Sequence, residues 1–104
     1  MEGGDAAPRW RSRLAERHHF ERHGAEVGAR DAGRYTASAL ATIRSGRRFT
    51  FRDLTTGEPR IGYFQRRTGR LTVVTADGLF IVTHFRCEGG AAYVRCLTES
   101  SYGA

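Results

Sequence analysis

Two histidines, His19 and His23, are the residues of this 104-residue chain whose type and spacing point most directly to chemistry. They lie four positions apart, so a helix would place both imidazole rings on one face, one turn from each other. Gly24 follows at once and is expected to end that helix just past the second ring. Because an imidazole accepts and donates protons near neutral pH, the pair predicts acid–base chemistry.

The charge of the chain suits an anionic substrate. All seventeen basic residues are arginine, and the formal net charge is +6. An arginine-only composition is also what a GC-rich bacterial genome would give. Each guanidinium can nevertheless bind phosphate through paired hydrogen bonds or stack on a base. The composition therefore favours an anionic partner, most simply a nucleic acid.

The length predicts one compact domain. We expect a flexible leader over residues 1–8, the domain over 9–97 and a frayed tail over 98–104. No apolar run is long enough to cross a bilayer, and the first residues lack the pattern of a signal peptide. Cys87 and Cys96 lack the spacing of a zinc site and are expected to behave as small hydrophobic residues.

The local pattern predicts two helices before any strand. The first is expected from near Pro8 to about His23. Asp31 is expected to cap a second helix, which presents Tyr35 on its apolar stripe and ends before Gly46.

From Arg48 onward the hydrophobic period changes to two, which is typical of strands. The Asp77-Gly78 pair predicts a hairpin turn. The strands are expected near residues 48–52, 61–66, 71–75, 79–86 and 91–97. The predicted fold class is therefore α+β, with two N-terminal helices packed on one face of a curved four- to five-stranded antiparallel sheet.

The order of these residues resembles a known family. The string His19-Phe20-x-x-His23-Gly24-x-Glu26-Val27-Gly28, followed by Tyr35, is similar to the opening of toxin domains in the barnase/EndoU/colicin/RelE-like (BECR) nuclease superfamily. Those domains occur in bacterial polymorphic toxins and phage proteins. The later matching pieces are Tyr63-Phe64, Thr68-Gly69, Val73-Val74, Asp77-Gly78 and Ile81-Val82-Thr83-His84-Phe85. The resemblance covers roughly residues 18–86.

The resemblance implies an endoribonuclease toxin domain that needs no metal or cofactor. It would cut RNA, with tRNA as one candidate, by 2′-hydroxyl transesterification. It would act in the bacterial cytoplasm, either its own or that of a target cell after delivery. We expect a monomer with no membrane partner and with an acidic immunity or antitoxin protein as its counterpart. The alternative is a non-catalytic RNA-binding or protein-interaction domain on the same fold.

Metal-independent RNA cleavage needs a base, an acid and cations that stabilise the phosphorane. The resemblance assigns His19 and His23 to base and acid, in either order. Thr83 matches a family threonine that can hydrogen-bond the scissile phosphate, although β-propensity alone also explains it. Thr83 would share the core face of Ile81 and so must lie near its rim. Arg60 is the preferred arginine for the phosphorane.

Two plainer uses of the histidines remain open. Either ring could be a packed side chain whose nitrogen is satisfied by a backbone carbonyl. A zinc site would resemble the His-Glu-x-x-His motif, but Glu21 follows His19 by two residues instead of one. Only His84 would then remain as a third imidazole ligand.

Strand alternation predicts a second polar group. A Gly89-Gly90 turn would place Arg86 opposite Tyr93 and His84 opposite Arg95, which gives a surface suited to phosphate. A solvated sheet face is the plainer interpretation. Further residues are predicted to bind RNA by charge or stacking, or else to be solvated: Arg47, Arg48, Tyr63, Arg66, Arg67 and Arg70.

Overall fold

The computed structural model describes residues 6–103, with side chains up to Thr98. Its elements are α1 (Arg13–His23), a 3-10 turn η2 (Ala25–Val27), α2 (Ala32–Ser45), β1 (Arg47–Arg52), β2 (Pro59–Gln65), β3 (Arg70–Thr75), β4 (Ile81–Arg86) and α3 (Ala91–Gly103). Helix α3 thus includes most of residues 98–104, the predicted tail, whereas residues 1–5 of the predicted leader lie outside the described residues. No helix within the described residues combines the length and apolar character needed to cross a bilayer.

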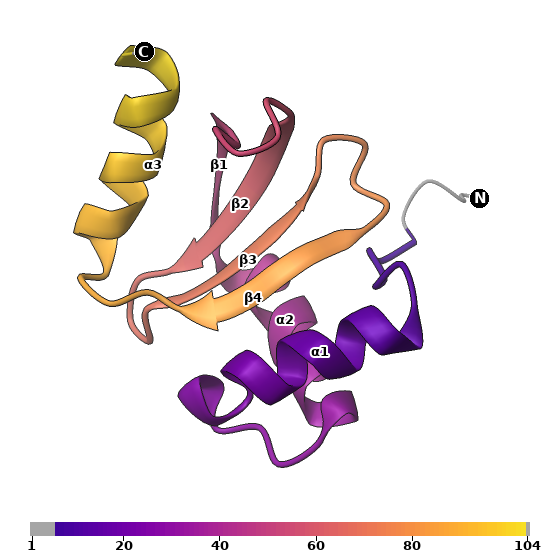
Figure 1. Ribbon diagram of the computed structural model, residues 1–104. Helices are drawn as coiled ribbons and strands as arrows, with labels where there is room; N and C mark the ends of the chain where they lie inside the picture. The colour runs from indigo at the N-terminus through magenta and orange to yellow at the C-terminus, as the bar shows by residue number, and fades with distance from the viewer. Residues whose placement is uncertain (1–5, 104) are drawn as a thin grey trace.

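The four strands form one antiparallel meander in the order β1-β2-β3-β4 (Figure 1). Strands that are consecutive in the chain are adjacent in the sheet, because the turns that join them are short. Strands β1 and β4 are therefore the two edges of the sheet. The α+β class and the antiparallel sheet are as the sequence predicts.

The caps explain where the first two helices begin. Asp31 accepts a hydrogen bond from the Arg34 amide at 2.8 Å, so the predicted cap of α2 is confirmed. Helix α1 begins at Arg13 instead of near Pro8, with Ser12 as its cap. The residues before it are extended because Arg9 pairs with the segment leading into β4: the Ile81 amide donates to the Arg9 carbonyl at 2.8 Å.

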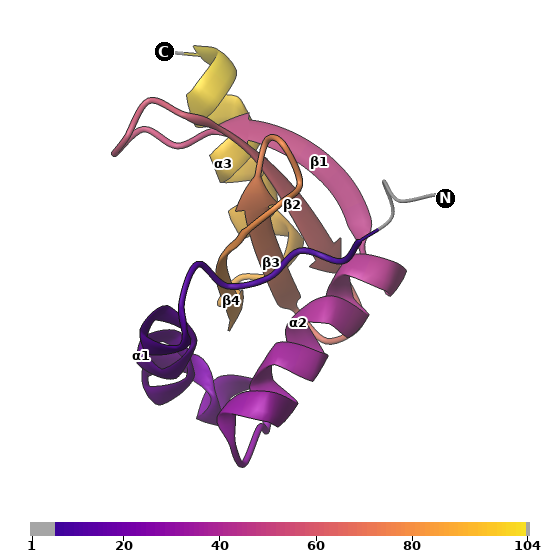
Figure 2. The ribbon, with the colours of Figure 1, turned by 90° about the vertical axis from the view of Figure 1, so that its right-hand side faces the viewer.

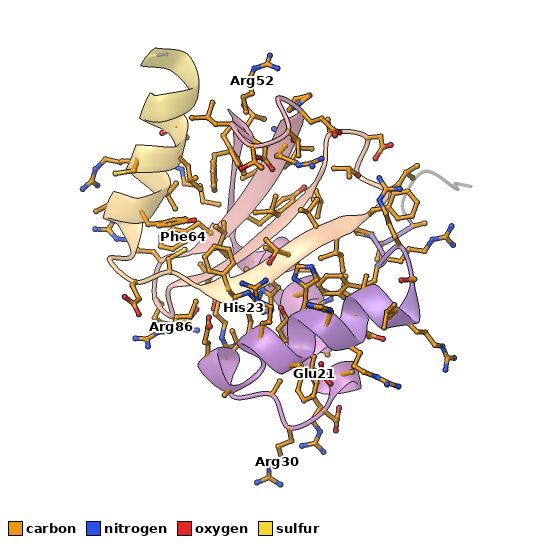
Figure 3. All side chains as sticks on the ribbon, viewed as in Figure 1. Glu21, His23, Arg30, Arg52, Phe64 and Arg86 are labelled. Carbon is orange, nitrogen blue, oxygen red and sulfur yellow. The ribbon has the colours of Figure 1, made fainter. Side chains whose placement is uncertain are left out.

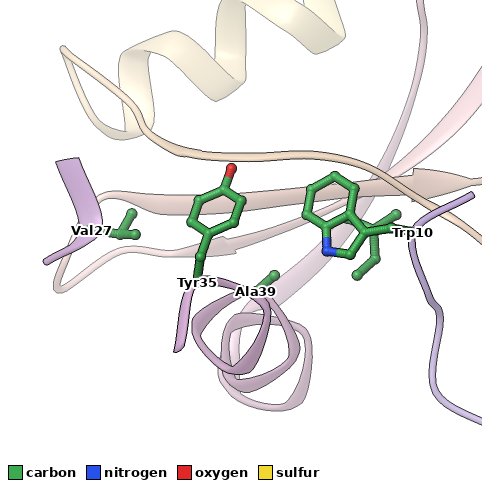
Figure 4. Packing of buried hydrophobic residues seen from close by; sticks show 5 residues of the cluster. Trp10, Val27, Tyr35 and Ala39 are labelled. Atoms are coloured by element: carbon green, nitrogen blue, oxygen red, sulfur yellow. The ribbon is translucent and has the colours of Figure 1, made fainter. Parts of the chain in front are cut away.

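Two helices pack around the first core cluster. Helix α2 lies against β2 and β3, whereas α1 packs on α2 and on the edge strand β4 (Figure 2). The cluster between them contains Trp10, Val27, Tyr35, Ala39 and Ile81, all less than 9% exposed (Figure 4). On this side of the sheet α2 covers the face, whereas α1 lies along the edge strand β4.

The predicted last strand over residues 91–97 is wrong, because these residues belong to α3. Ala91, Val94 and Leu97 recur every three residues and pack on the opposite face of the sheet, against residues such as Leu71. That face is apolar, and an additional edge strand would have left it exposed. Helix α3 covers part of it instead, so the two sheet faces are packed against different helices.

We predict that Tyr35→Phe destabilises the protein by about 1–3 kcal/mol. The Tyr35 side chain is fully buried, and its hydroxyl donates to the His84 carbonyl on β4, which the change would leave unpaired. The free energy of unfolding in urea measures the loss. The control Tyr63→Phe changes a half-exposed tyrosine and is expected to cost within about 0.5 kcal/mol. Equal losses in the two variants would contradict this account.

Candidate functional site

Helix α1 presents His19 and His23 to the edge strand β4. The Nδ1 atom of His19 lies 3.3 Å from the Thr83 hydroxyl oxygen. The His19 ring is stacked between Trp10, at 5.1 Å between centroids, and His23, at 6.3 Å. His23 in turn lies 5.6 Å from the ring of Phe85. The structure thus places both histidines and Thr83 in one cluster.

The surroundings of His19 favour its neutral form. Partial burial is the main cause that lowers the pKa of His19 below 6.5. The nearby positive charges of His23, His18 and Arg22 lower it further. A neutral imidazole at pH 7 can accept a proton, so His19 is suited to the role of a base.

His23 has a different partner. Its Nδ1 atom lies 3.0 Å from Glu26 Oε2 on η2, and the other carboxylate oxygen accepts the Arg86 backbone amide at 3.3 Å. A carboxylate that accepts from Nδ1–H fixes the tautomer and the orientation of the ring. Glu26 is absent from the functional residues predicted from the sequence. Its position three residues after His23, inside the motif, is the signal that could have indicated it.

A basic pocket opens beside His23. It has a volume of about 820 Å³ and lies between the end of α1, the β2–β3 turn and the β4–α3 turn. Arg66, Arg67 and Arg86 line it together with Tyr93, and its walls also include Glu26 and Glu88. Figure 3 shows Arg86 at the end of β4, on the side of the molecule where His23 projects from α1. The pocket joins one predicted catalytic residue to two of the predicted RNA-binding arginines.

Arg60 lies near the other end of the cluster. It lines a pocket of about 300 Å³ that also includes His19 and Trp10. Its side chain is 11% exposed, and two carboxylates lie close: Asp53 Oδ2 at 3.8 Å from Nε and Glu58 Oε1 at 3.5 Å from Nη1. These acids offset the charge of Arg60, so it is a weaker phosphate ligand than the sequence alone suggests.

Three of the other predicted RNA-binding residues lie apart from this cluster, whereas Arg70 contacts η2 beside it. Arg47 and Arg48 are exposed on β1, at the opposite edge of the sheet. Tyr63 is half-buried in β2, one strand further in. The Arg70 guanidinium donates to the Val27 carbonyl at 2.9 Å and so holds η2 in place.

The predicted polar surface of His84, Arg86, Tyr93 and Arg95 does not form. His84 is fully buried beneath α2, and Tyr93 and Arg95 lie on α3 instead of a strand. Arg86 alone of the four remains on the exposed end of β4. Both faces of the sheet are packed against helices, so the face that carries His84 is covered by α2 and not open to solvent.

The predicted grouping of Thr83 with Ile81 on one face is also wrong. A register shift pairs Val74 with Ile81 and Val73 with Thr83. Because Val73 and Val74 are consecutive, their partners point to opposite faces. Ile81 joins the core under α2, whereas Thr83 shares the other face with Phe85.

His84 is a satisfied core histidine. Its Nδ1 lies 3.0 Å from the Leu71 carbonyl and 2.9 Å from the Thr72 hydroxyl, and its Nε2 lies 2.9 Å from the Ser38 hydroxyl. The ring can therefore donate from Nδ1 and accept at Nε2 while it stays neutral. Every nitrogen of His84 is used inside the fold.

The ligands of the alternative zinc site are not assembled. His84 lies under α2, on the face of the sheet opposite Thr83, and both of its ring nitrogens are hydrogen-bonded inside the fold. Glu21 is exposed on α1, on the side of the helix away from the sheet (Figure 3). Within residues 6–103 no three His, Cys, Asp or Glu side chains gather in a group that could hold a metal ion.

Comparison with known proteins gives no family for this chain. No protein-family model matches it, and no curated protein is significantly similar to it. The BECR resemblance therefore stays a prediction drawn from the motif residues.

We predict that His84 makes the protein less stable in acid. Burial lowers the pKa of His84 to about 4, from 6.5 in an unfolded chain. Between these values the unfolded state binds more protons, so the free energy of unfolding falls as the pH drops from about 6.5 to 4. The full effect is on the order of 3 kcal/mol. Urea unfolding at several pH values measures it.

The control for this effect is His84→Gln, which removes the titrating group. The free energy of unfolding of this variant is expected to be lower than that of the wild type at pH 7. It should also change less between pH 6.5 and 4. A pH dependence identical to that of the wild type would show that His84 is not the group responsible.

Proposed function

We propose that this chain is a metal-independent endoribonuclease toxin domain in which His19 and His23 form the acid–base pair. The observation that carries the proposal is the contact of His19 with Thr83 and His23, beside a pocket lined by arginines. The products would be a 2′,3′-cyclic phosphate and a 5′-hydroxyl. No step of this reaction needs a redox partner or a co-substrate.

His19 is the proposed base. When its Nδ1–H donates to the Thr83 hydroxyl, the lone pair on Nε2 is free to accept the proton of the ribose 2′-hydroxyl. The lowered pKa of His19 keeps this lone pair available at neutral pH. Thr83 would then have two roles, because it would orient the ring and hydrogen-bond a phosphate oxygen.

His23 is the proposed acid. In the protonated ring, Nδ1–H donates to Glu26 and Nε2–H can pass its proton to the leaving 5′-oxygen. The 2′-oxygen–phosphorus bond forms as the phosphorus–5′-oxygen bond breaks. His19 ends protonated and His23 neutral, and exchange with water restores both rings.

Guanidinium groups would stabilise the anionic phosphorane. Arg66, Arg67 and Arg86 line the pocket that includes His23, where neutralised phosphates add binding energy. Arg60 could assist from the side of His19, with part of its charge offset by Asp53.

The motif resemblance supplies the biological setting of the proposal. The substrate would be tRNA or another structured RNA in a bacterial cytoplasm. The partner would be an immunity or antitoxin protein with an acidic surface, complementary to the +6 charge of this chain. We propose a monomer as the active form.

A non-catalytic RNA-binding domain is the second candidate. It is favoured by the packing of the His19 ring between Trp10 and His23, which is also a structural use of a histidine. It predicts salt-sensitive RNA binding without any cyclic-phosphate product.

We predict that His19→Ala and His23→Ala each lower kcat/KM for RNA cleavage by about 10²- to 10⁴-fold, the usual size of one acid–base contribution. The assay is the initial rate on a fluorescent RNA in buffer that contains a chelator. The matched control is His18→Ala, which removes an exposed imidazole from the same helix and should leave the rate unchanged. Thermal unfolding of each variant checks its fold.

Growth arrest on expression provides a second readout. The wild type and His18→Ala should arrest growth, whereas cells should tolerate the other two variants. If His19→Ala and His23→Ala stay folded and fully active, the acid–base assignment is wrong.

A further inference from the structure

An apolar pocket opens beside Thr83, on the sheet face that α3 covers in part. Its volume is about 410 Å³, within the usual range for small-ligand pockets. Helix α3 packs mainly against β1, at the far edge of the sheet, which leaves side chains near β4 uncovered. The walls include Phe51, Leu71, Val73, Phe85, Tyr93 and Leu97.

The apolar pocket adjoins the basic pocket beside His23. Both are lined by Phe85 and Tyr93, whose rings meet edge to face at 5.8 Å between centroids. Tyr93 is 36% exposed, so its ring can be reached from solvent. On one side of this aromatic pair the walls are mainly apolar, with Arg52 and Asp53 also among them, and on the other they carry arginines such as Arg86.

This arrangement matches the two chemistries of a nucleotide. A base is flat, aromatic and weakly hydrated on its faces, whereas the phosphate is anionic. A base inside a duplex has its faces covered by its neighbours, so only an unstacked base can enter an apolar pocket. A phosphate attached to such a base would lie within reach of the basic pocket and of His23.

We propose that the two pockets bind a single-stranded RNA segment, with one unpaired base in the apolar pocket and the adjoining phosphates in the basic pocket. The inference rests on the proposed ribonuclease function and names its substrate class: RNA with an unpaired nucleotide at the cleavage position. Tyr93 is then the residue that selects this class, because its ring contacts the base.

The first test separates binding from cleavage. The probe is a short, fluorescent 2′-O-methyl oligonucleotide, which has no 2′-hydroxyl and cannot be cut. Fluorescence anisotropy at fixed salt compares the single strand with a blunt duplex of the same sequence. The single strand should bind about tenfold or more tightly, as one or two base–aromatic stacks allow. A duplex that binds equally well or better would overturn the inference.

Variants of Tyr93 test the aromatic contact. Tyr93→Ala should weaken single-strand binding about tenfold, the loss of roughly one base stack. Tyr93→Phe keeps the ring and should bind as the wild type does. The matched control is Leu79→Ala in the β3–β4 turn, which removes an exposed apolar side chain outside the pocket and should have no effect. Loss in Tyr93→Phe, or no loss in Tyr93→Ala, contradicts the proposal.

The basic pocket has its own readout. Replacing both Arg66 and Arg67 by alanine should reduce the slope of log affinity against log salt by about 0.7 for each phosphate that the protein no longer neutralises. Arg30→Ala removes a guanidinium that points away from the pocket and should leave the slope unchanged (Figure 3). If the double variant keeps the slope of the wild type, phosphates do not bind in this pocket.

These results are distinct from those that test the ribonuclease proposal. Cleavage of RNA without any preference for single strands would overturn the pocket assignment and leave the enzyme assignment in place. Tight single-strand binding that depends on Tyr93, without cleavage of unmodified RNA, would support the pockets and contradict the enzyme assignment.

Discussion

The packing of Tyr35 is the interaction on which the rest of the structure depends. Its fully buried ring, on α2, contacts Trp10 from the extended N-terminal segment, Phe20 from α1 and His84 from β4. Helix α1 has no fully buried residue of its own, and its partly buried Phe20 packs on the Tyr35 ring. The contacts around Tyr35 hold α1 at the edge strand, and this position brings His19 to Thr83.

The position of α1 also makes two identical side chains chemically different. His19 is inserted between two rings, and its partial burial lowers its pKa. His23, one turn later, faces the basic pocket and is held by Glu26. One residue type can supply both an acid and a base when its two copies have different surroundings. The proposed mechanism depends on this difference.

Local signals predicted much of the fold, and tertiary packing decided the remainder. The Asp31 cap and the strand meander follow from neighbours in the chain. Helix α3 could not be predicted in this way, because a short apolar run such as 91–97 is compatible with a strand or a helix. Packing against the second face of the sheet decides in favour of the helix. His84 was misplaced for the same reason, since alternation cannot tell which face a helix will cover. The contact of His23 with Glu26 could not be predicted from the sequence, because it depends on the conformation of η2.

We propose that the histidine cluster cleaves RNA without a metal. The most direct measurement is the end chemistry of total RNA incubated with the purified wild-type protein, with and without a chelator. We expect equal cleavage in both samples, with 2′,3′-cyclic phosphate and 5′-hydroxyl ends. Cleavage that the chelator abolishes, or fragments with 5′-phosphate ends, would contradict it.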